Sequence, residues 1–296
     1  MVQKMKGLIF INPFLVTKQN VHQAERLKEE FNKKGIEIEI VSDGYLHVTI
    51  NSDGALVDFK GIDFAIYLDK DKYLSEVLER GGLRLFNRHE AVRICDDKAQ
   101  TCIALLGKGV NMPTTVFGAL CYSSKSEIKP ETADKIAIQT GYPVVIKESF
   151  GSLGKGVYIA RDKNELLLVM EQVKLKPHLF QSYCGAKPGT DIRVIVIGGK
   201  VIASMERHND GDFRSNIAQG GVGKAIELPN NYKKTALRCA EVLGLDYCGV
   251  DLLYGDDGEP VVCEVNSNAF FDGIEKVTGV NVAKAYVEHV IKTLSK

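Results

Sequence analysis

The segment VDLLYGDDGEPVVCEVNSN, residues 250–268, has the pattern of two strands joined by a tight turn. VDLLY and PVVCEV are apolar runs, and GDDG between them is typical of a turn. Asp251 interrupts the first run, while Glu264 and Asn266 are two residues apart, so the alternation of a strand puts both on one face. A hairpin register can place Asp251 beside them, and three oxygen ligands suit a hard cation such as Mg²⁺. The alternative is an edge strand whose polar side chains face water.

Composition restricts the class of protein. The chain has 296 residues, 45% of them hydrophobic, which suits two or three lobes of one enzyme. Its 38 basic residues balance 38 acidic ones, so the overall charge favours neither nucleic acid nor a membrane surface as a partner. Seven scattered cysteines without a CxxC pair argue against a disulfide framework and a zinc site. Together with the lack of a signal-like or membrane-spanning run, they predict a cytoplasmic protein.

Strand-like and helix-like patterns alternate in the first part of the chain, which predicts an open α/β sheet of Rossmann-like layout. The turn after its first strand has no glycines, so it is not expected to bind a dinucleotide. Asn12 and Pro13 are instead predicted to shape a turn at the substrate edge. The expected strands are 7–11, 36–41, 64–69 and 83–87, and the expected helices are 21–34 and 72–80.

A glycine-rich loop is the main feature of the middle of the chain. The strand GYPVVIKES places Lys147 on a sheet face, and SFGSLGKGVYIA (149–160) continues as a loop and a second strand. The glycine spacing matches neither a dinucleotide fingerprint nor a P-loop. Backbone N–H groups of such a loop can surround phosphates, although a plain glycine-rich hairpin is the alternative. The remaining elements expected here are helices over 90–108, 131–140 and 162–173 and strands over 114–117 and 178–184.

Arginines converge in the last third of the chain. Residues 190–208 have the pattern of a hairpin around Gly198–Gly199, in which Asp191 and Arg193 share a face. A polar, glycine-rich stretch follows, which we expect to be a loop over a cleft. Guanidinium groups match carboxylate and phosphate oxygens, so the arginines predict anionic ligands, with a solvated basic face as the alternative. This part of the chain also carries Met205 and Arg207 on one face, Arg214 and Asn216 in the loop, and expected helices over 230–243 and 282–294.

Four segments taken together resemble the ATP-grasp superfamily, and within it the RimK-type amino-acid ligases. They are DIRVIVIGGKVIASMER, GDFRSNIAQGG, GVDLL, and EVNSN followed by DGIEKVTGVNVA. The resemblance implies an α/β (α+β) ATP-grasp fold with an N-terminal Rossmann-like pre-ATP-grasp domain over 1–90. It further implies a central subdomain with a glycine-rich lid over 91–184 and a C-terminal subdomain with the metal site over 185–296.

The resemblance also implies roles for individual residues. Phosphate and nucleotide contacts are expected from Lys98, Lys147, Gly151, Ser152, Gly154, Lys155, Gly156, Gln181, Ser182, Tyr183, Cys184, Asp191, Arg214 and Asn216. Asp251, Glu264 and Asn266 are expected to hold two Mg²⁺ ions, with Mn²⁺ as a substitute. Arg214, Arg193 and Lys147 are the expected catalytic residues, and Arg193, Arg207 and Asn268 the expected substrate contacts. From the residues alone, a lysine that follows an acidic pair, as Lys98 does, is usually solvated.

The activity implied is an ATP-dependent ligase that joins a carboxylate to an amine through an acyl phosphate. Its substrate is expected to be glutamate or a similar amino acid, added to a protein, a peptide or a small molecule, and a homo-oligomer is expected. Two departures stand out: Ser182 replaces a glutamate common in the family, and NAFF (268–271) replaces a proline–glycine turn. A D-alanine–D-alanine-type ligase and a nucleotide-binding protein without turnover are the alternatives.

Overall fold

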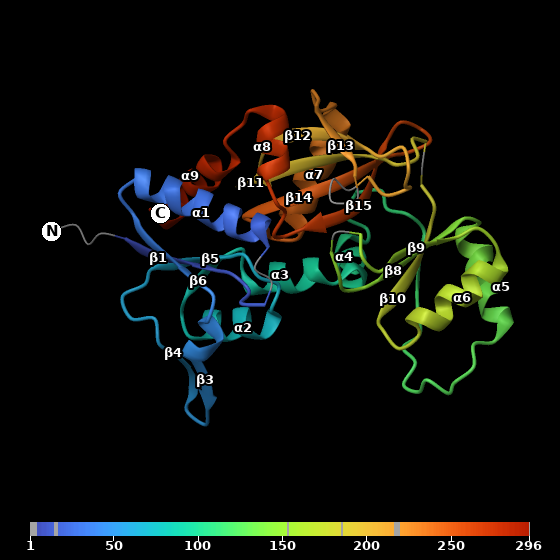
Figure 1. Ribbon diagram of the computed structural model, residues 1–296, viewed down its shortest axis with the longest axis horizontal. Coiled ribbons are helices and arrows are strands. Elements are labelled where there is room, and N and C mark those ends of the chain that lie inside the picture. Colours follow the sequence, from blue (N-terminus) through green and yellow to red (C-terminus); the bar gives the residue numbers. More distant parts are fainter. Residues whose placement is uncertain (1–4, 15–16, 153, 185, 216–219, 296) are drawn as a thin grey trace.

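The first part of the chain forms a parallel sheet in the computed structural model (Figure 1), which describes residues 5–14, 17–152, 154–184, 186–215 and 220–295. The strand order is β2-β1-β5-β6, and the helices α1 and α2 connect the strands. This confirms the predicted open α/β sheet and fits a Rossmann-like layout. The bounds are β1 Lys6–Phe10, α1 Lys18–Lys33, β2 Glu37–Val41, β5 Phe64–Tyr67, α2 Lys72–Arg80 and β6 Arg84–Phe86. A 3₁₀ turn (Gly44–His47) and a hairpin of β3 (Val48–Asn51) and β4 (Gly54–Val57) had not been predicted.

The predicted single helix over 90–108 is wrong, because the helix breaks at Asp97. The structure has α3 (His89–Asp96) and α4 (Lys98–Leu105), with Asp97 in an extended conformation between them. The Asp97 carboxylate accepts hydrogen bonds from the backbone N–H groups of Ala99 and Gln100, so it acts as the N-cap of α4. The break places Lys98 at the first position of α4, where its N–H donates to the carbonyl of Ser149 beside the glycine-rich loop.

The middle part forms an antiparallel sheet in the order β7-β10-β8-β9. Helices α5 and α6 lie beside it, at the right of Figure 1, and their apolar side chains share a core with β8 and β10. The strand–loop–strand reading of the glycine-rich segment is confirmed, since β8 and β9 flank it and pair with each other. The bounds are β7 Thr115–Phe117, α5 Pro130–Thr140, β8 Val144–Glu148, β9 Val157–Ala160, α6 Lys163–Val173 and β10 His178–Ser182.

The last part forms an antiparallel sheet in the order β13-β12-β11-β14-β15. Helix α7 packs on one face, and on the other face α8 and α9 share a core with α1 and the first sheet. The predicted hairpins are confirmed, whereas β13 and α8 had not been predicted. The bounds are β11 Thr190–Ile197, β12 Lys200–His208, β13 Val222–Ala225, α7 Asn230–Val242, β14 Tyr247–Tyr254, β15 Pro260–Asn266, α8 Asp272–Thr278 and α9 Val282–Leu294.

Asn87 joins the first sheet to the last. Its buried side-chain amide donates to the carbonyls of Tyr247 and Ser267, both at 2.7 Å, and accepts from the N–H of Tyr247 at 3.0 Å. Because the three bonds reach β14 and the end of β15, they fix the edge of the first sheet against the strands that carry Asp251 and Glu264. The three main sheets each fall within one of the predicted ranges 1–90, 91–184 and 185–296, and this division of the chain into domains stays a prediction.

Within the ranges described, no helix combines the length and the apolar character needed to cross a membrane.

Candidate active site

Strand alternation brings the predicted charged residues of the last sheet to one face. Even-numbered residues of β11 such as Val194 and Val196 pack under α7, so Asp191 and Arg193 point to the other side. The register pairs Asp191 with Arg207 and Arg193 with Asp251. Asp251 in turn pairs with Glu264, and Gly249 with Asn266. The predicted convergence of Asp251, Glu264 and Asn266 on one sheet face is therefore what the backbone shows.

A connected ion-pair network on this face joins three buried residues, Asp191, Arg207 and Asp251, to the partly buried Arg193. Arg193 donates to both oxygens of Asp251 at 2.6 and 2.5 Å, and Arg207 donates to both oxygens of Asp191 at 2.7 and 2.5 Å. A contact of 3.1 Å between Arg207 and Asp251 links the pairs. Burial opposes the ionisation of Asp251, but the charges of Arg193 and Arg207 prevail and lower its pKa. The network is neutral as a whole, and its members are held in fixed positions.

The glycine-rich loop lies over this face and is held by two of the predicted phosphate-binding cations. Lys98 Nζ donates to the carbonyl of Gly151, and Arg214 donates to the carbonyl of Gly154, each at 2.9 Å. Lys147 is buried beneath, with Nζ 3.4 Å from the carbonyl of Cys263. These three cations, which come from three separate segments of the sequence, thus surround one space.

Glycine is required at the end of the loop. Gly156 has a φ of +71°, and a Cβ there would lie 3.0 Å from side-chain atoms of Glu148. A side chain would therefore combine backbone strain with a tight contact against β8. The loop sequence thus sets how closely the loop approaches the sheet beneath it.

The cavity beneath the loop is lined by most of the predicted nucleotide residues. Its free space is about 110 Å³, well below the roughly 300 Å³ or more of ordinary ligand pockets. Since Gly151, Ser152 and Gly154 form part of its wall, the position of the loop limits the free space of this cavity. The predicted residues in the lining are Lys98, Lys147, Gly151, Ser152, Gly154, Lys155, Gln181, Ser182, Tyr183, Cys184, Asp191, Arg207, Arg214, Asp251 and Glu264. Gly156 is not in the lining, and Asn216 lies outside the described residues.

Gln181 has an unused acceptor in this cavity. The residue is 3% exposed, and Nε2 donates to Thr115 Oγ1 at 3.0 Å, while Oε1 has no hydrogen-bond partner among the residues that the structure describes. A buried acceptor without a partner costs about 1–3 kcal/mol, so a ligand donor there would be favourable. Ser182, which the sequence analysis singled out as a departure, accepts from the N–H of Thr114 at 3.0 Å. Its hydroxyl thus joins β10 to the segment before β7.

A second, larger cavity of about 780 Å³ adjoins the first. The two share Ser152, Arg207 and Glu264 in their linings. The predicted residues Arg193, Asn266 and Asn268 line the second cavity, in which Asn268 donates to the carbonyl of Leu68 at 2.6 Å. Helix α1 contributes Asn20 to its lining, and the segments that follow β1 and β5 contribute Asn12, Asp69, Lys70 and Asp71. Of these, sequence reasoning had placed only Asn12 near a substrate.

The oxygen donors of this face fit a divalent cation. The Glu264 side chain is 24% exposed, its nearest cation is Lys98 at 3.7 Å, and it lines both cavities with room for a ligand. Asn266 adds a neutral amide oxygen. Asp251 uses both oxygens in bonds to guanidinium groups, but a carboxylate has about four lone-pair sites, so a further ligand bond remains available to it. Two carboxylates and an amide are a donor set suited to Mg²⁺ or Mn²⁺.

Comparison with known proteins gives the class of fold and then the family. A solved ATP-grasp protein with a RimK domain, from Sphaerobacter thermophilus DSM 20745, superposes with a TM-score of 0.71 at 20% identity, covering 96% of this chain and 98% of that one. The chain therefore has the predicted α/β ATP-grasp fold. A family model described as a RimK-like ATP-grasp domain matches residues 95–290, and the chain belongs to that family.

Two curated relatives extend this result. The chain is 38% identical over 232 residues to N-acetylaspartylglutamate synthase A from Homo sapiens, an alignment that covers 78% of this chain and 58% of that one. It is 32% identical over 295 residues to a probable alpha-L-glutamate ligase from Maridesulfovibrio salexigens, covering 94% of each. The names of both relatives refer to glutamate.

Proposed function

We propose that the protein is an ATP-dependent carboxylate–amine ligase that adds glutamate, or a similar amino acid, through an acyl phosphate. The observation that carries this proposal is the pair of adjacent cavities, which share Ser152, Arg207 and Glu264 in their linings. Lys98, Lys147, Arg214 and the glycine-rich loop line one cavity, and the other is lined by amides, carboxylates and the cations Lys70, Arg193, Arg207 and Lys276. The names of the relatives support glutamate as the amino acid.

The reaction divides between the two cavities. In the first step a carboxylate oxygen of the substrate attacks the γ-phosphorus of ATP, the bond to the β,γ-bridging oxygen breaks, and ADP leaves. In the second step the amine nitrogen attacks the acyl carbon, phosphate leaves with its bonding electrons, and the nitrogen loses a proton. The protein contributes position and charge neutralisation, because phosphoryl transfer needs little covalent chemistry from side chains.

Each part of the site has a role in this scheme. Lys147, Lys98 and Arg214 neutralise phosphate charge, and the unpaired Gln181 oxygen accepts a hydrogen bond from the base. Asp251, Glu264 and Asn266 would hold magnesium, which when bound screens the phosphate oxygens and polarises the γ-phosphoryl group. The glycine-rich loop excludes water, which would otherwise hydrolyse the acyl phosphate.

The test is an ADP-release screen in which carboxylates and amines are offered in pairs and products are identified by mass spectrometry. We expect ADP release to require magnesium or manganese, an amino acid and a second substrate, with an amide as product. Glu264→Gln should abolish turnover without changing the folded state. Release with paired D-alanine alone would favour the dipeptide-ligase alternative, and nucleotide binding without any substrate-dependent release would favour a protein without turnover.

For the location in the cell and the oligomeric state we keep the predictions from the sequence. We propose a cytoplasmic homo-oligomer, and cell fractionation and light scattering on the purified protein would test these two properties.

A further inference from the structure

The first sheet has a crevice at the carboxyl ends of its strands, where the chain changes direction across the sheet. From β1 the chain moves outward to β2, and it then returns to the other side of β1 to form β5. In open parallel sheets ligands bind at such a switch point. Asn12 follows β1 by two residues and Asp69 follows β5 by two residues, and both line the second cavity.

Asp69 has only neutral partners at this point. Asn12 Nδ2 donates to its two oxygens at 3.1 and 3.2 Å, and the backbone N–H of Lys70 donates to Oδ1 at 2.7 Å. Among the described residues no cation lies within ion-pair distance of Asp69. The ammonium group of Lys70 is paired with Asp96 at 3.1 Å instead.

Two of the other carboxylates of the cavity lining have a cation within 4 Å, and the third, Asp71, serves as a helix cap. Glu264 lies 3.7 Å from Lys98, and Asp272 lies 3.9 Å from Lys276. Asp71 accepts hydrogen bonds from two N–H groups and so caps α2. Burial raises the pKa of Asp69, which means that its charge is held at a cost without a counter-ion. Unpaired, partly buried charges of this kind are characteristic of binding sites, where the ligand supplies the partner.

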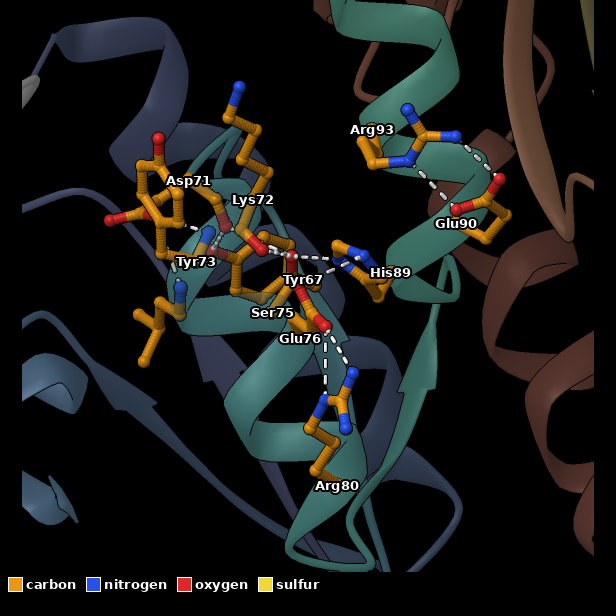
Figure 2. A network of polar contacts seen from close by, with 11 residues as sticks. Tyr67, Asp71, Lys72, Tyr73, Ser75, Glu76, Arg80, His89, Glu90 and Arg93 are labelled. Carbon is orange, nitrogen blue, oxygen red and sulfur yellow. Dashed lines mark hydrogen bonds and ion pairs between the residues drawn. The ribbon is translucent and has the colours of Figure 1, made fainter. Parts of the chain in front are cut away.

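The loop that carries Asp69 is fixed before any ligand arrives. Tyr67, the last residue of β5, donates through its hydroxyl to the carbonyl of Asp71 at 2.6 Å. Ser75 Oγ donates to the same carbonyl and lies 3.0 Å from His89 Nδ1, so α2 and α3 are joined at this point. Figure 2 shows these contacts converging on the first turn of α2. Because Asp69 lies between Tyr67 and Asp71, its backbone is held at both sides.

We infer that Asp69 binds the ammonium group of an amino-acid substrate in the second cavity. Asn12 orients the Asp69 carboxylate for this contact. The inference rests on the proposed ligase function, and it adds the chemical class of one substrate: a molecule that carries a protonated amine. It also assigns the first sheet a part in specificity, whereas the predicted substrate contacts Arg193, Arg207 and Asn268 all lie in the last sheet or directly after it. A ligand of the same shape without the amine would leave Asp69 unpaired.

The test compares two ligands that differ only in the amine. Protein saturated with magnesium and a non-hydrolysable ATP analogue is titrated calorimetrically with L-glutamate and with glutarate. The variant is Asp69→Asn, which keeps the shape, and the matched control is Asp63→Asn, the same charge change just before β5 and outside the cavity. Should Asp69→Asn fail to fold, Asp69→Ala replaces it.

We expect the unaltered protein and Asp63→Asn to bind glutamate at least about tenfold more tightly than glutarate. Asp69→Asn should lose this preference while its affinity for the ATP analogue stays unchanged. A preference that survives in Asp69→Asn, or no preference in the unaltered protein, overturns the inference. If glutamate does not bind, the other L-amino acids are titrated, and failure of all of them also overturns it. Failure of the unaltered protein to bind the ATP analogue would instead refute the proposed function, independently of Asp69.

Discussion

Replacement of Asp251 by asparagine should destabilise the fold strongly as well as abolish turnover. The change removes one negative charge from the ion-pair network and turns one acceptor into an N–H donor that faces a guanidinium group. Arg207, with its side chain 4% exposed, keeps its two bonds to Asp191. Arg193, with its side chain 12% exposed, loses the carboxylate to which both of its described bonds run.

The magnitude follows from the number of cations left without a partner. One largely buried guanidinium group is uncompensated, and breaking a buried pair in this way costs about 3–5 kcal/mol. Glu264→Gln supplies the matched control, because its side chain is 24% exposed and its nearest cation is 3.7 Å away. Loss of so loose and partly solvated a contact costs about 0–1 kcal/mol. Both variants should lack ligase activity, and only Asp251→Asn should lose stability.

Equilibrium unfolding in urea, followed by circular dichroism and tyrosine fluorescence, measures the difference between the two variants. A double variant, Arg193→Met with Asp251→Leu, should regain much of the loss, because replacing both partners removes the uncompensated charge. If the free energy of unfolding of Asp251→Asn lies within about 0.5 kcal/mol of that of the unaltered protein, the network does not stabilise the fold and our reasoning about it is wrong.

The pH dependence of this difference has a definite sign. The pKa of Asp251 is lowered in the folded state, so the unfolded chain takes up the proton first as the pH falls. The stabilisation by Asp251 is therefore complete above the ordinary aspartate pKa of 3.8 and is lost as the pH falls through the lower folded value. At pH 7 the difference in the free energy of unfolding between Asp251→Asn and the unaltered protein should therefore have its full size, and it should become smaller only in strong acid.

Three further predictions concern other parts of the structure. Asp69→Asn should raise the melting temperature of the ligand-free protein at pH 7, because the raised pKa of Asp69 means that its ionised form is unfavourable in the folded protein. The increase should be smaller near pH 4, where Asp69 is partly protonated. An unchanged or lower melting temperature at pH 7 would contradict this prediction. Asn87→Leu should cost about 3 kcal/mol in urea unfolding, since three buried backbone groups lose their bonds, and a cost below 1 kcal/mol would show that those groups find other partners. Lys98→Met should speed tryptic cleavage after Lys155 by releasing one of the two bonds to the glycine-rich loop, and an unchanged cleavage rate would mean that Arg214 alone holds the loop.

The sequence predicted the charged sheet face well because that face depends on local alternation. Once residues 190–208 and 250–268 are strands, period two alone puts Asp191 with Arg193 and Glu264 with Asn266. The hairpin register then adds Asp251, as the structure shows. These inferences needed no knowledge of how the lobes pack.

Other features depended on contacts between distant segments. The role of Asn268 in holding Leu68 joins residues 200 apart in sequence, and Asp69 meets Asn12 across 57 residues. A signal was nevertheless present, because a polar residue follows each of two adjacent parallel strands at the same offset. The break at Asp97 was also legible in principle, since an aspartate before a helical run is a common N-cap. It was missed because the apolar pattern continues across it.

The three hydrogen bonds of Asn87 and the apolar core shared by α1 and α9 hold the first sheet against the last sheet. The middle sheet contributes to neither, so we expect that tilting of this sheet opens the nucleotide cavity at a lower cost in free energy than movement of the other two sheets. Such a hinge would widen the first cavity, while the walls of the second cavity that come from the first and last parts of the chain would stay in place. The amino acid would then bind to a largely preformed site, whereas the nucleotide would bind to a site that closes around it.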